Sequence, residues 1–411
     1  MGATEMVLLL LGSVFVLESL ADVLNLGSLK GQVPEEFQGI FDPEKYRTAL
    51  SYQTDLTRFD LLQRGLSFAG LAAFIWLGCF NQLDQVARGF HQGVIVTGLI
   101  FVGLLSSLRI VLHLPFSLVS TFVIEARYGF NQTTLGTFLG DLIKGTVLGS
   151  LIGGLVFSGL IYFFETAADW AWLYGWGALT VFQLLLGYLA PVIILPLFYR
   201  FEPLADGELK KAIEAYARTR KFRLSGIFTM DSSKRSSKSN AFFTGFGKLR
   251  KLVLFDTLIA KQSVEELVAV LAHEIGHFEK KHILHSMVLS IAVSGVMLFG
   301  FSLLLKNPEL FSAFRMDEAS IYAGLIVLGI LSSPVMRILG ICTSYLSRRN
   351  EFEADAFARE TYGKPEVLIA ALKKLSVDHL SHLTPHPLKV ILEYSHPPVL
   401  QRIAALRKGE K

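Results

Sequence analysis

The sequence predicts a mainly α-helical protein that crosses a membrane seven times and carries a smaller region of helices and a sheet on one side. Of its 411 residues, 52% are hydrophobic and only 18% are charged, and the mean hydropathy is +0.47. Soluble proteins of this length carry more charge, so the composition indicates several membrane spans. The small net charge of +4 and the lack of a basic stripe with interleaved aromatics argue against nucleic acid as a partner.

Seven apolar stretches are long enough to cross a bilayer, which takes about 20 helical residues each. No Lys or Arg precedes the first stretch and no small-residue cleavage site follows it, so we expect a retained span rather than a cleaved signal peptide. The seven stretches are residues 6–26, 67–83, 94–114, 145–165, 172–197, 286–305 and 319–341.

These spans divide the chain into four regions. Region 1–197 holds spans one to five, and region 286–341 holds spans six and seven, while regions 198–285 and 342–411 are polar. Lys and Arg gather in the two polar regions and in the segments on the same side as them. Because positive charges near span ends stay in the cytosol, we expect the N-terminus outside and both polar regions in the cytosol. The bilayer is either a bacterial cytoplasmic membrane or the endoplasmic reticulum.

Ionisable residues occur within two of the spans. Glu18 and Asp22 stand four apart in the first span, and Arg109 and His113 stand four apart in the third. Such residues face protein or water because lipid does not solvate them. Each pair therefore either packs toward other helices or lines an internal water-filled cavity.

The polar regions mix helices with short strands. Residues 206–220 have a helical pattern, and three apolar, β-favouring runs follow them, which predict a small antiparallel sheet. The tail is expected to form two or three helices broken at Gly363, at Pro385/Pro387 and at Pro397-Pro398. The three runs are Gly226–Met230, Ala241–Phe246 and Leu252–Phe255.

A metal-binding pattern lies in region 198–285, where His273, Glu274 and His277 form the motif H-E-x-x-H. Ser263 and Glu266 make a capping-box pair before it, which predicts that the motif lies on a helix. Histidines four apart project from one helix face, so both imidazoles can bind one Zn²⁺. Glu274 then faces the open side of the metal, where it can deprotonate a zinc-bound water. Alone, the motif also fits two solvent-facing histidines.

The third ligand does not come from the extended motif, which requires Gly at position 280 and His at position 283, because these positions are Lys280 and Ile283. His282 and His285 are nearby, but neither stands three or four residues from His277, so each is a weaker candidate.

An acidic pair at the cytosolic end of span seven is the better source of a ligand. Glu351 and Asp355 share one helix face. Residues 306–318 form only a short return between spans six and seven, so this helix and the motif helix are expected to be neighbours. We expect Glu351 to be the third ligand and Asp355 to hold a histidine Nδ1–H. Glu353 is a rival ligand on another face, and a solvated acidic helix start is the alternative without function.

These residues resemble those of the type I CaaX prenyl proteases, membrane zinc endopeptidases that process prenylated C-termini. The resemblance covers nearly the whole chain and rests on several segments in the family's order. Besides the two metal motifs they are Tyr128-Gly129-Phe130-Asn131, Ser239-Asn240-Ala241, Leu254-Phe255-Asp256-Thr257-Leu258, Ser347-Arg348 and Ser395-His396-Pro397-Pro398 followed by Arg402-Ile403.

The resemblance implies seven membrane helices around a water-filled chamber, with a zincin-like catalytic region that holds one Zn²⁺ per chain on the cytosolic side. It also implies removal of the aaX tripeptide from a prenylated peptide or protein. Asn240 matches an asparagine that binds the substrate backbone, although a turn residue is the alternative. His396 matches a histidine that stabilises the oxyanion, and Arg402 is expected to orient Glu351 or His396.

Two other functions fit the same residues. A membrane quality-control metalloprotease would use this chemistry on unprenylated or damaged membrane proteins. A metal transporter or sensor would use the histidines without catalysis, but its ligands should lie near the middle of the bilayer. The remaining tail histidines, His379, His382 and His386, lie in polar or proline-flanked sequence and are expected to be solvated.

Overall fold

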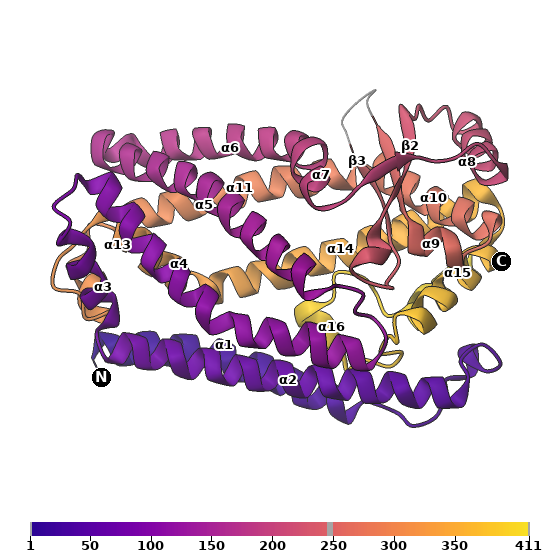
Figure 1. Ribbon diagram of the computed structural model, residues 1–411, viewed down its shortest axis with the longest axis horizontal. Helices are drawn as coiled ribbons and strands as arrows, with labels where there is room; N and C mark the ends of the chain where they lie inside the picture. Colours follow the sequence, from indigo (N-terminus) through magenta and orange to yellow (C-terminus); the bar gives the residue numbers. More distant parts are fainter. Residues whose placement is uncertain (1, 245–249, 410–411) are drawn as a thin grey trace.

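The computed structural model describes residues 2–244 and 250–409. Long helices run along the molecule, and a small sheet with several shorter helices is gathered at one end (Figure 1). The first helix begins at the opposite end. The polar regions 198–285 and 342–411 meet at the sheet end, although spans six and seven separate them in the chain.

Five helical segments are long and apolar enough to cross a membrane, and two bent helix pairs bring the total to seven if each pair is one span. The prediction of a mainly helical, multi-pass membrane protein is confirmed. The five segments contain α1 (Ala3–Gly27), α4 (Val94–Val119), α5 (Leu135–Thr166), α6 (Ala171–Leu189) with α7 (Leu195–Phe198), and α11 (His282–Leu304).

The two bent pairs correspond to the second and seventh predicted spans. Helix α2 (Pro43–Trp76) and α3 (Cys79–Arg88) meet at 64°, and α13 (Ile321–Leu331) and α14 (Ser333–Tyr362) meet at 51°. Helix α2 begins well before the predicted stretch 67–83 because Asp42 caps a polar first half that hydropathy does not register. Helix α14 likewise continues past residue 341, out of the apolar stretch and into the sheet end.

The spans pack along narrow seams. Only 0–22% of the most apolar window in each of the five segments is buried within the protein. Helices α4 and α6 continue through the π-helical turns η2 (Ser120–Glu125) and η4 (Ala190–Ile194), with Pro115 and Pro191 at or near these turns. Wider turns of this kind absorb the hydrogen bonds that proline removes from a helix.

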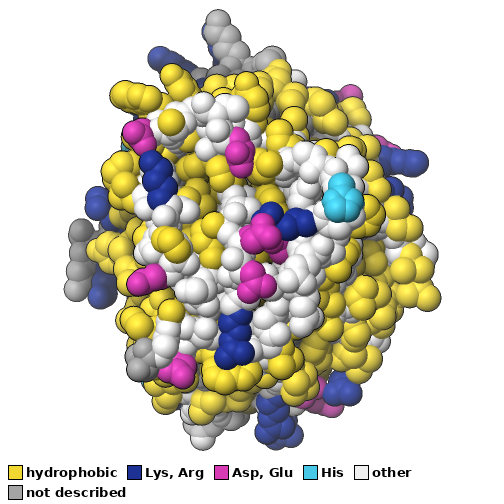
Figure 2. Space-filling view, turned by 90° about the vertical axis from the view of Figure 1, so that its left-hand side faces the viewer, with side chains coloured by type: hydrophobic (Ala, Val, Ile, Leu, Met, Phe, Trp, Pro, Cys, Tyr) yellow, Lys and Arg dark blue, Asp and Glu magenta, His cyan; other side chains and the backbone are white. Residues whose placement is uncertain are grey.

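The end of the molecule opposite the sheet is polar at its centre. Figure 2 shows acidic, basic and uncharged polar groups there, with hydrophobic side chains around them. Ion pairs on this side join Arg88 to Asp84 and Glu318, and Lys306 to Asp169. Charged groups at this end fit a surface that is exposed to water on the side of the bilayer opposite the sheet.

The sheet has four strands in the order β1-β2-β4-β3, formed by β1 (Phe201–Pro203), β2 (Gly226–Met230), β3 (Ala241–Thr244) and β4 (Lys251–Phe255). The predicted small sheet is present, but it is mixed rather than antiparallel, because β2 and β4 run parallel, with Phe228 opposite Val253. Strand β3 pairs antiparallel with the far side of β4 and lies at an edge of the sheet. Residues 245–246 of the predicted second run lie outside the described residues.

Most of the remaining helices lie near this sheet, whereas α12 (Pro308–Ala313) packs in the core of the opposite end, together with α13. The helix carrying H-E-x-x-H, α10 (Val264–Glu279), buries Leu271, Ala272 and Ile275 in the core of this end. The other helices are α8 (Glu208–Thr219), α9 (Asp256–Lys261), α15 (Pro365–Asp378), α16 (Pro387–Glu393) and α17 (Val399–Lys408). The tail breaks near Gly363, Pro387 and Pro398 as predicted, but it holds four helical segments rather than two or three: the end of α14, then α15, α16 and α17.

Candidate active site

The motif helix α10 starts at the predicted cap. The Ser263 hydroxyl accepts from the Glu266 amide, and the Glu266 carboxylate accepts from the Ser263 amide, which completes the capping box. Lys374 of α15 pairs with the same carboxylate at 2.7 Å. Burial raises the pKa of Glu266, but its hydrogen bonds to Lys374 and Ser263 outweigh burial and lower it. The start of the catalytic helix is thus fixed by charge and by hydrogen bonds.

Helices α10 and α14 approach closely at Gly276. A Cβ atom there would lie 3.0 Å from the Ala354 Cα and 3.2 Å from the Phe357 Cβ, closer than ordinary carbon contacts. Glycine therefore lets the two helix backbones meet one turn from Glu351. The expectation that the two motif helices are neighbours is confirmed.

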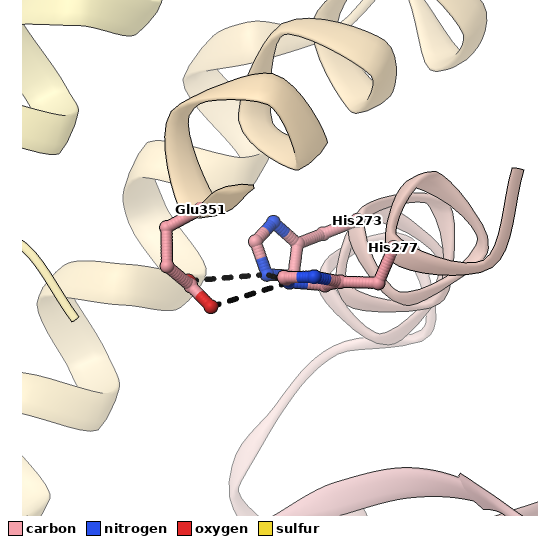
Figure 3. A group of neighbouring side chains, drawn as sticks. All are labelled: His273, His277 and Glu351. Atoms are coloured by element: carbon pink, nitrogen blue, oxygen red, sulfur yellow. Dashed lines mark hydrogen bonds and ion pairs between the residues drawn. The ribbon is translucent and has the colours of Figure 1, made fainter. Parts of the chain in front are cut away.

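This approach brings His273, His277 and Glu351 to a common point (Figure 3). The two imidazole Nε2 atoms lie 3.1 Å apart. The Glu351 oxygens lie 3.5 Å from His273 Nε2 and 3.2 Å from His277 Nε2. Around a tetrahedral Zn²⁺ with bonds of about 2.0–2.1 Å, ligand atoms are separated by about 3.3 Å. The three donors therefore already have the spacing of one zinc coordination face.

Neighbouring charges and hydrogen bonds shift the pKa values of the ligand residues. Burial raises the pKa of Glu351, but hydrogen bonds to His273 and His277 and the nearby Arg402 hold it well below its usual range. Burial lowers the pKa of His273, yet hydrogen bonds to Asp355 and Glu351 raise it to about 9. The carboxylates thus stabilise positive charge here. Glu351 Oε2 lies 3.2 Å from Arg402 and 3.5 Å from His273 but accepts no well-formed hydrogen bond among the described residues, which also fits a metal ligand.

Asp355 and Arg402 support the cluster from behind. Asp355 Oδ1 accepts from His273 Nδ1 at 2.9 Å, which turns the Nε2 lone pair of that histidine toward the centre. The Arg402 guanidinium binds both Asp355 oxygens, at 2.7 and 2.8 Å, and lies 3.2 Å from Glu351. Arg402 is buried, so it acts through these carboxylates.

Glu274 and His396 face a cavity of about 830 Å³ that the metal cluster also lines. Burial raises the pKa of Glu274, which suits a group that takes up and returns protons near neutral pH. His396 Nε2 lies 3.3 Å from Glu351, and its Nδ1 lies 2.9 Å from the Ser395 hydroxyl. Both side chains can reach a substrate carbonyl placed beside the cluster.

The segment before His396 is tied to α14. Arg348, one turn before Glu351, donates from one Nη to the carbonyl oxygens of Val390 and Tyr394 at 2.9 and 2.6 Å. This contact joins Arg348 to the segment that leads to His396, although the two are far apart in the chain.

Asn240 lines the same cavity directly before the edge strand β3. Its side-chain oxygen accepts from the Ala241 amide at 2.9 Å. The preceding segment is held from two sides: Thr257 donates to the Lys238 carbonyl, and the Ser237 amide donates to the Phe130 carbonyl. The segments that begin at Tyr128 and Leu254 thus hold in place the backbone that precedes Asn240.

The tail histidines are not solvated as expected. His379 accepts from the Ser239 amide at 3.0 Å and lines the cavity, as does His382, whose Nε2 lies 3.3 Å from the Asn25 carbonyl. His386 accepts from the Leu388 amide at the start of α16. The local sequence carries no signal for the contacts of His379 and His382, because their partners come from the segment before β3 and from helix α1.

His282 and Glu353, considered as alternative ligands, lie behind the cluster rather than within it. The metal-binding group found among the described residues contains neither of them. They contact each other, with His282 Nε2 3.2 Å from the Glu353 carboxylate. His285 is exposed.

The charged residues of the first span are paired with protein. Asp22 accepts from Arg64 at 2.6 Å and contacts Lys389 of α16, while Glu18 lies 2.7 Å from Arg337. These contacts favour the simpler interpretation of a helix face turned toward other helices. In the third span, His113 lies 2.9 Å from Gln63 of α2.

Comparisons with known proteins extend over the whole chain. Residues 23–200 match the family model described as CAAX prenyl protease N-terminal, five membrane helices, and residues 203–410 match peptidase family M48. The CAAX prenyl protease 1 homolog of Arabidopsis thaliana is 32% identical over 97% of this chain and 96% of its own, and that of Homo sapiens is 34% identical over 91% and 88%. The crystal structure of S. mikatae Ste24p superposes with a TM-score of 0.93 at 31% identity and covers 99% of both chains.

Proposed function

Because this chain belongs to peptidase family M48, as a membrane zinc metalloprotease of the CAAX prenyl protease 1 type, we propose that it removes the aaX tripeptide from proteins that end in a prenylated cysteine. One observation carries the proposal: two imidazoles and a buried carboxylate, from helices α10 and α14, converge on a cavity large enough for a peptide. The curated relatives that match along the chain carry the name of this activity.

We assign the metal to His273, His277 and Glu351, with one Zn²⁺ per chain. The ion would polarise the scissile carbonyl and acidify a water molecule, as in other zinc peptidases. Glu274 takes a proton from the attacking water and returns it to the leaving amine. Its raised pKa and its position on the cavity wall support both transfers.

His396 stabilises the oxyanion that forms on the scissile carbonyl. Because His396 Nε2 faces the Glu351 carboxylate, we assign the proton to Nε2, and Nδ1 then accepts from the Ser395 hydroxyl. Arg402 is a positioning residue, because its guanidinium is buried against Asp355 and Glu351 rather than exposed to the substrate.

Asn240 and the edge of β3 hold the substrate backbone in an extended form. Since the Asn240 side-chain oxygen is used by the Ala241 amide, its Nδ2 group can donate to a substrate carbonyl. Among the described residues, no hydrogen bond uses that nitrogen.

The lipid portion of the substrate is placed among the spans. Little of each span is buried by protein, which leaves apolar helix surface for a long lipid chain to contact. The excess of Lys and Arg in regions 198–285 and 342–411 supports a cytosolic active site. The ligand helix α10 packs in the same core as the sheet, and Glu351 lies beyond the apolar stretch 319–341, so the cluster is at the end of the spans, which argues against a transporter.

A pair of peptides tests the proposal. The purified protein should cleave a farnesylated CaaX peptide between the modified cysteine and the first aliphatic residue, and 1,10-phenanthroline should stop the reaction. An unfarnesylated twin of the same sequence should have a much lower kcat/KM. Equal kcat/KM values would instead support a quality-control protease, and cleavage that persists in phenanthroline would overturn the metal assignment.

A further inference from the structure

The Nδ1 atoms of His273 and His277, which point away from the metal position, contact different groups. His273 Nδ1 faces the Asp355 carboxylate, a common arrangement for a metal-binding histidine. His277 Nδ1 instead faces a second imidazole, with His282 Nδ1 at 3.0 Å. His282 Nε2 in turn lies 3.2 Å from the Glu353 carboxylate, which also accepts from Arg349 Nε at 2.9 Å.

Only one proton arrangement satisfies this chain when His277 binds a metal. Its Nε2 faces His273 and Glu351, so Nε2 must present a lone pair and Nδ1 must carry the proton. That proton is donated to His282 Nδ1, which must therefore be unprotonated. His282 Nε2 then carries its own proton and donates it to Glu353, which as a carboxylate accepts. Each group in the chain thereby fixes the tautomer of the next.

The backbone is shaped to bring His282 back to the cluster. His282 is 4% exposed and is the first residue of α11. Lys281 before it has a left-handed conformation with φ of 58°, which breaks the helix after α10 and turns the chain. Glu353 lies on α14, two residues beyond Glu351, so the hydrogen-bond chain leaves α10 and returns to the helix that supplies the third ligand.

We propose that His282 is a positioning residue for the metal site: it fixes the tautomer and ring orientation of His277, and Glu353 holds it in place. This inference rests on the metal site proposed above. Outer partners of this kind typically change metal affinity by about 10- to 100-fold when they are removed.

Three variants test the role of His282. H282F removes the acceptor and keeps a ring in the site, whereas H282N keeps an acceptor close to the Nδ1 position. H285N is the matched control, because His285 is exposed one turn further along α11. The zinc dissociation constant of each purified protein is measured by chelator competition, and thermal unfolding of the chelator-treated proteins reports their fold.

H282F should bind zinc about 10- to 100-fold more weakly, while H282N and H285N should stay close to the unmodified protein. Unchanged affinity in H282F, or an equal loss in H282F and H282N, would overturn the role of His282. If H282F does not fold, E353A replaces it. A smaller loss of zinc affinity in E353A supports the hydrogen-bonded series from His277 through His282 to Glu353, and an unchanged affinity refutes it. An unmodified protein that binds no zinc would instead refute the proposed function itself.

Discussion

Replacing Gly276 with alanine tests how closely α10 and α14 must approach. The new Cβ would meet the Ala354 Cα at 3.0 Å, the Ala354 carbonyl oxygen at 3.1 Å and the Phe357 Cβ at 3.2 Å. Carbon atoms prefer separations of about 3.5–4.0 Å, so the helices must move apart by about 0.5 Å. Because two of these contacts are with backbone atoms and helices are stiff, a rotamer change cannot relieve the strain.

This movement is large for a metal site. Ligand distances are held within about 0.2 Å, and His277 and Glu351 sit on the two helices that must separate. Overpacking typically costs about 1–3 kcal/mol, partly offset by about 1 kcal/mol from the better helix propensity of alanine. We expect a modest loss of stability and a decrease of about tenfold or more in kcat/KM and zinc affinity.

Chelator competition and steady-state cleavage of a farnesylated peptide measure these effects in G276A. G340A is the matched control, because Gly340 also lies in α14 and a Cβ there would meet no atom within 4 Å outside its own helix backbone. G340A should behave like the unmodified protein. Native zinc affinity and turnover in G276A, or an equal loss in G340A, would refute the role of the close approach.

Three further predictions concern catalysis, substrate binding and the helix cap. E274Q should keep zinc bound but lower kcat by about 10²- to 10⁴-fold; zinc loss, or near-native turnover, would contradict its role as proton carrier. N240A should raise KM for the farnesylated peptide more than it lowers kcat, and an unchanged KM would argue for a turn residue. Glu266 has a lowered pKa in the folded protein, so its stabilisation is present above about pH 4.3, the ordinary glutamate value, and is lost as the pH falls through the folded value. E266Q should therefore lower the melting temperature at neutral pH and flatten its decline in acid, and parallel pH curves for the two proteins would exclude this cap effect.

Local signals in the sequence were sufficient for the spans and the motif helix. Hydropathy located the spans, and the Ser263–Glu266 pair, three residues apart, marked the start of α10. The adjacency of α10 and α14 followed from the short return between two spans. The partners of Arg402 did not follow, because its bidentate contact with Asp355 joins helices that only the tertiary fold brings together.

The sheet could not be derived in the same way. Strands β2, β3 and β4 follow one another in the chain, which suggests two hairpins, but β3 passes to the outer side of β4 and leaves β2 and β4 parallel. Strand β1 was not predicted at all, because three residues ending in Pro203 give no alternation to detect. The partly buried contacts of His379 and His382 were missed for a similar reason, since their partners are distant in sequence.

Anomalous diffraction at the zinc edge, from crystals of the unmodified protein, tests the assignment of the metal most directly. We predict one peak per chain, about 2 Å from Nε2 of His273, Nε2 of His277 and the Glu351 carboxylate. A peak elsewhere in the chain, or one that lacks any of these three side chains as a ligand, would contradict it.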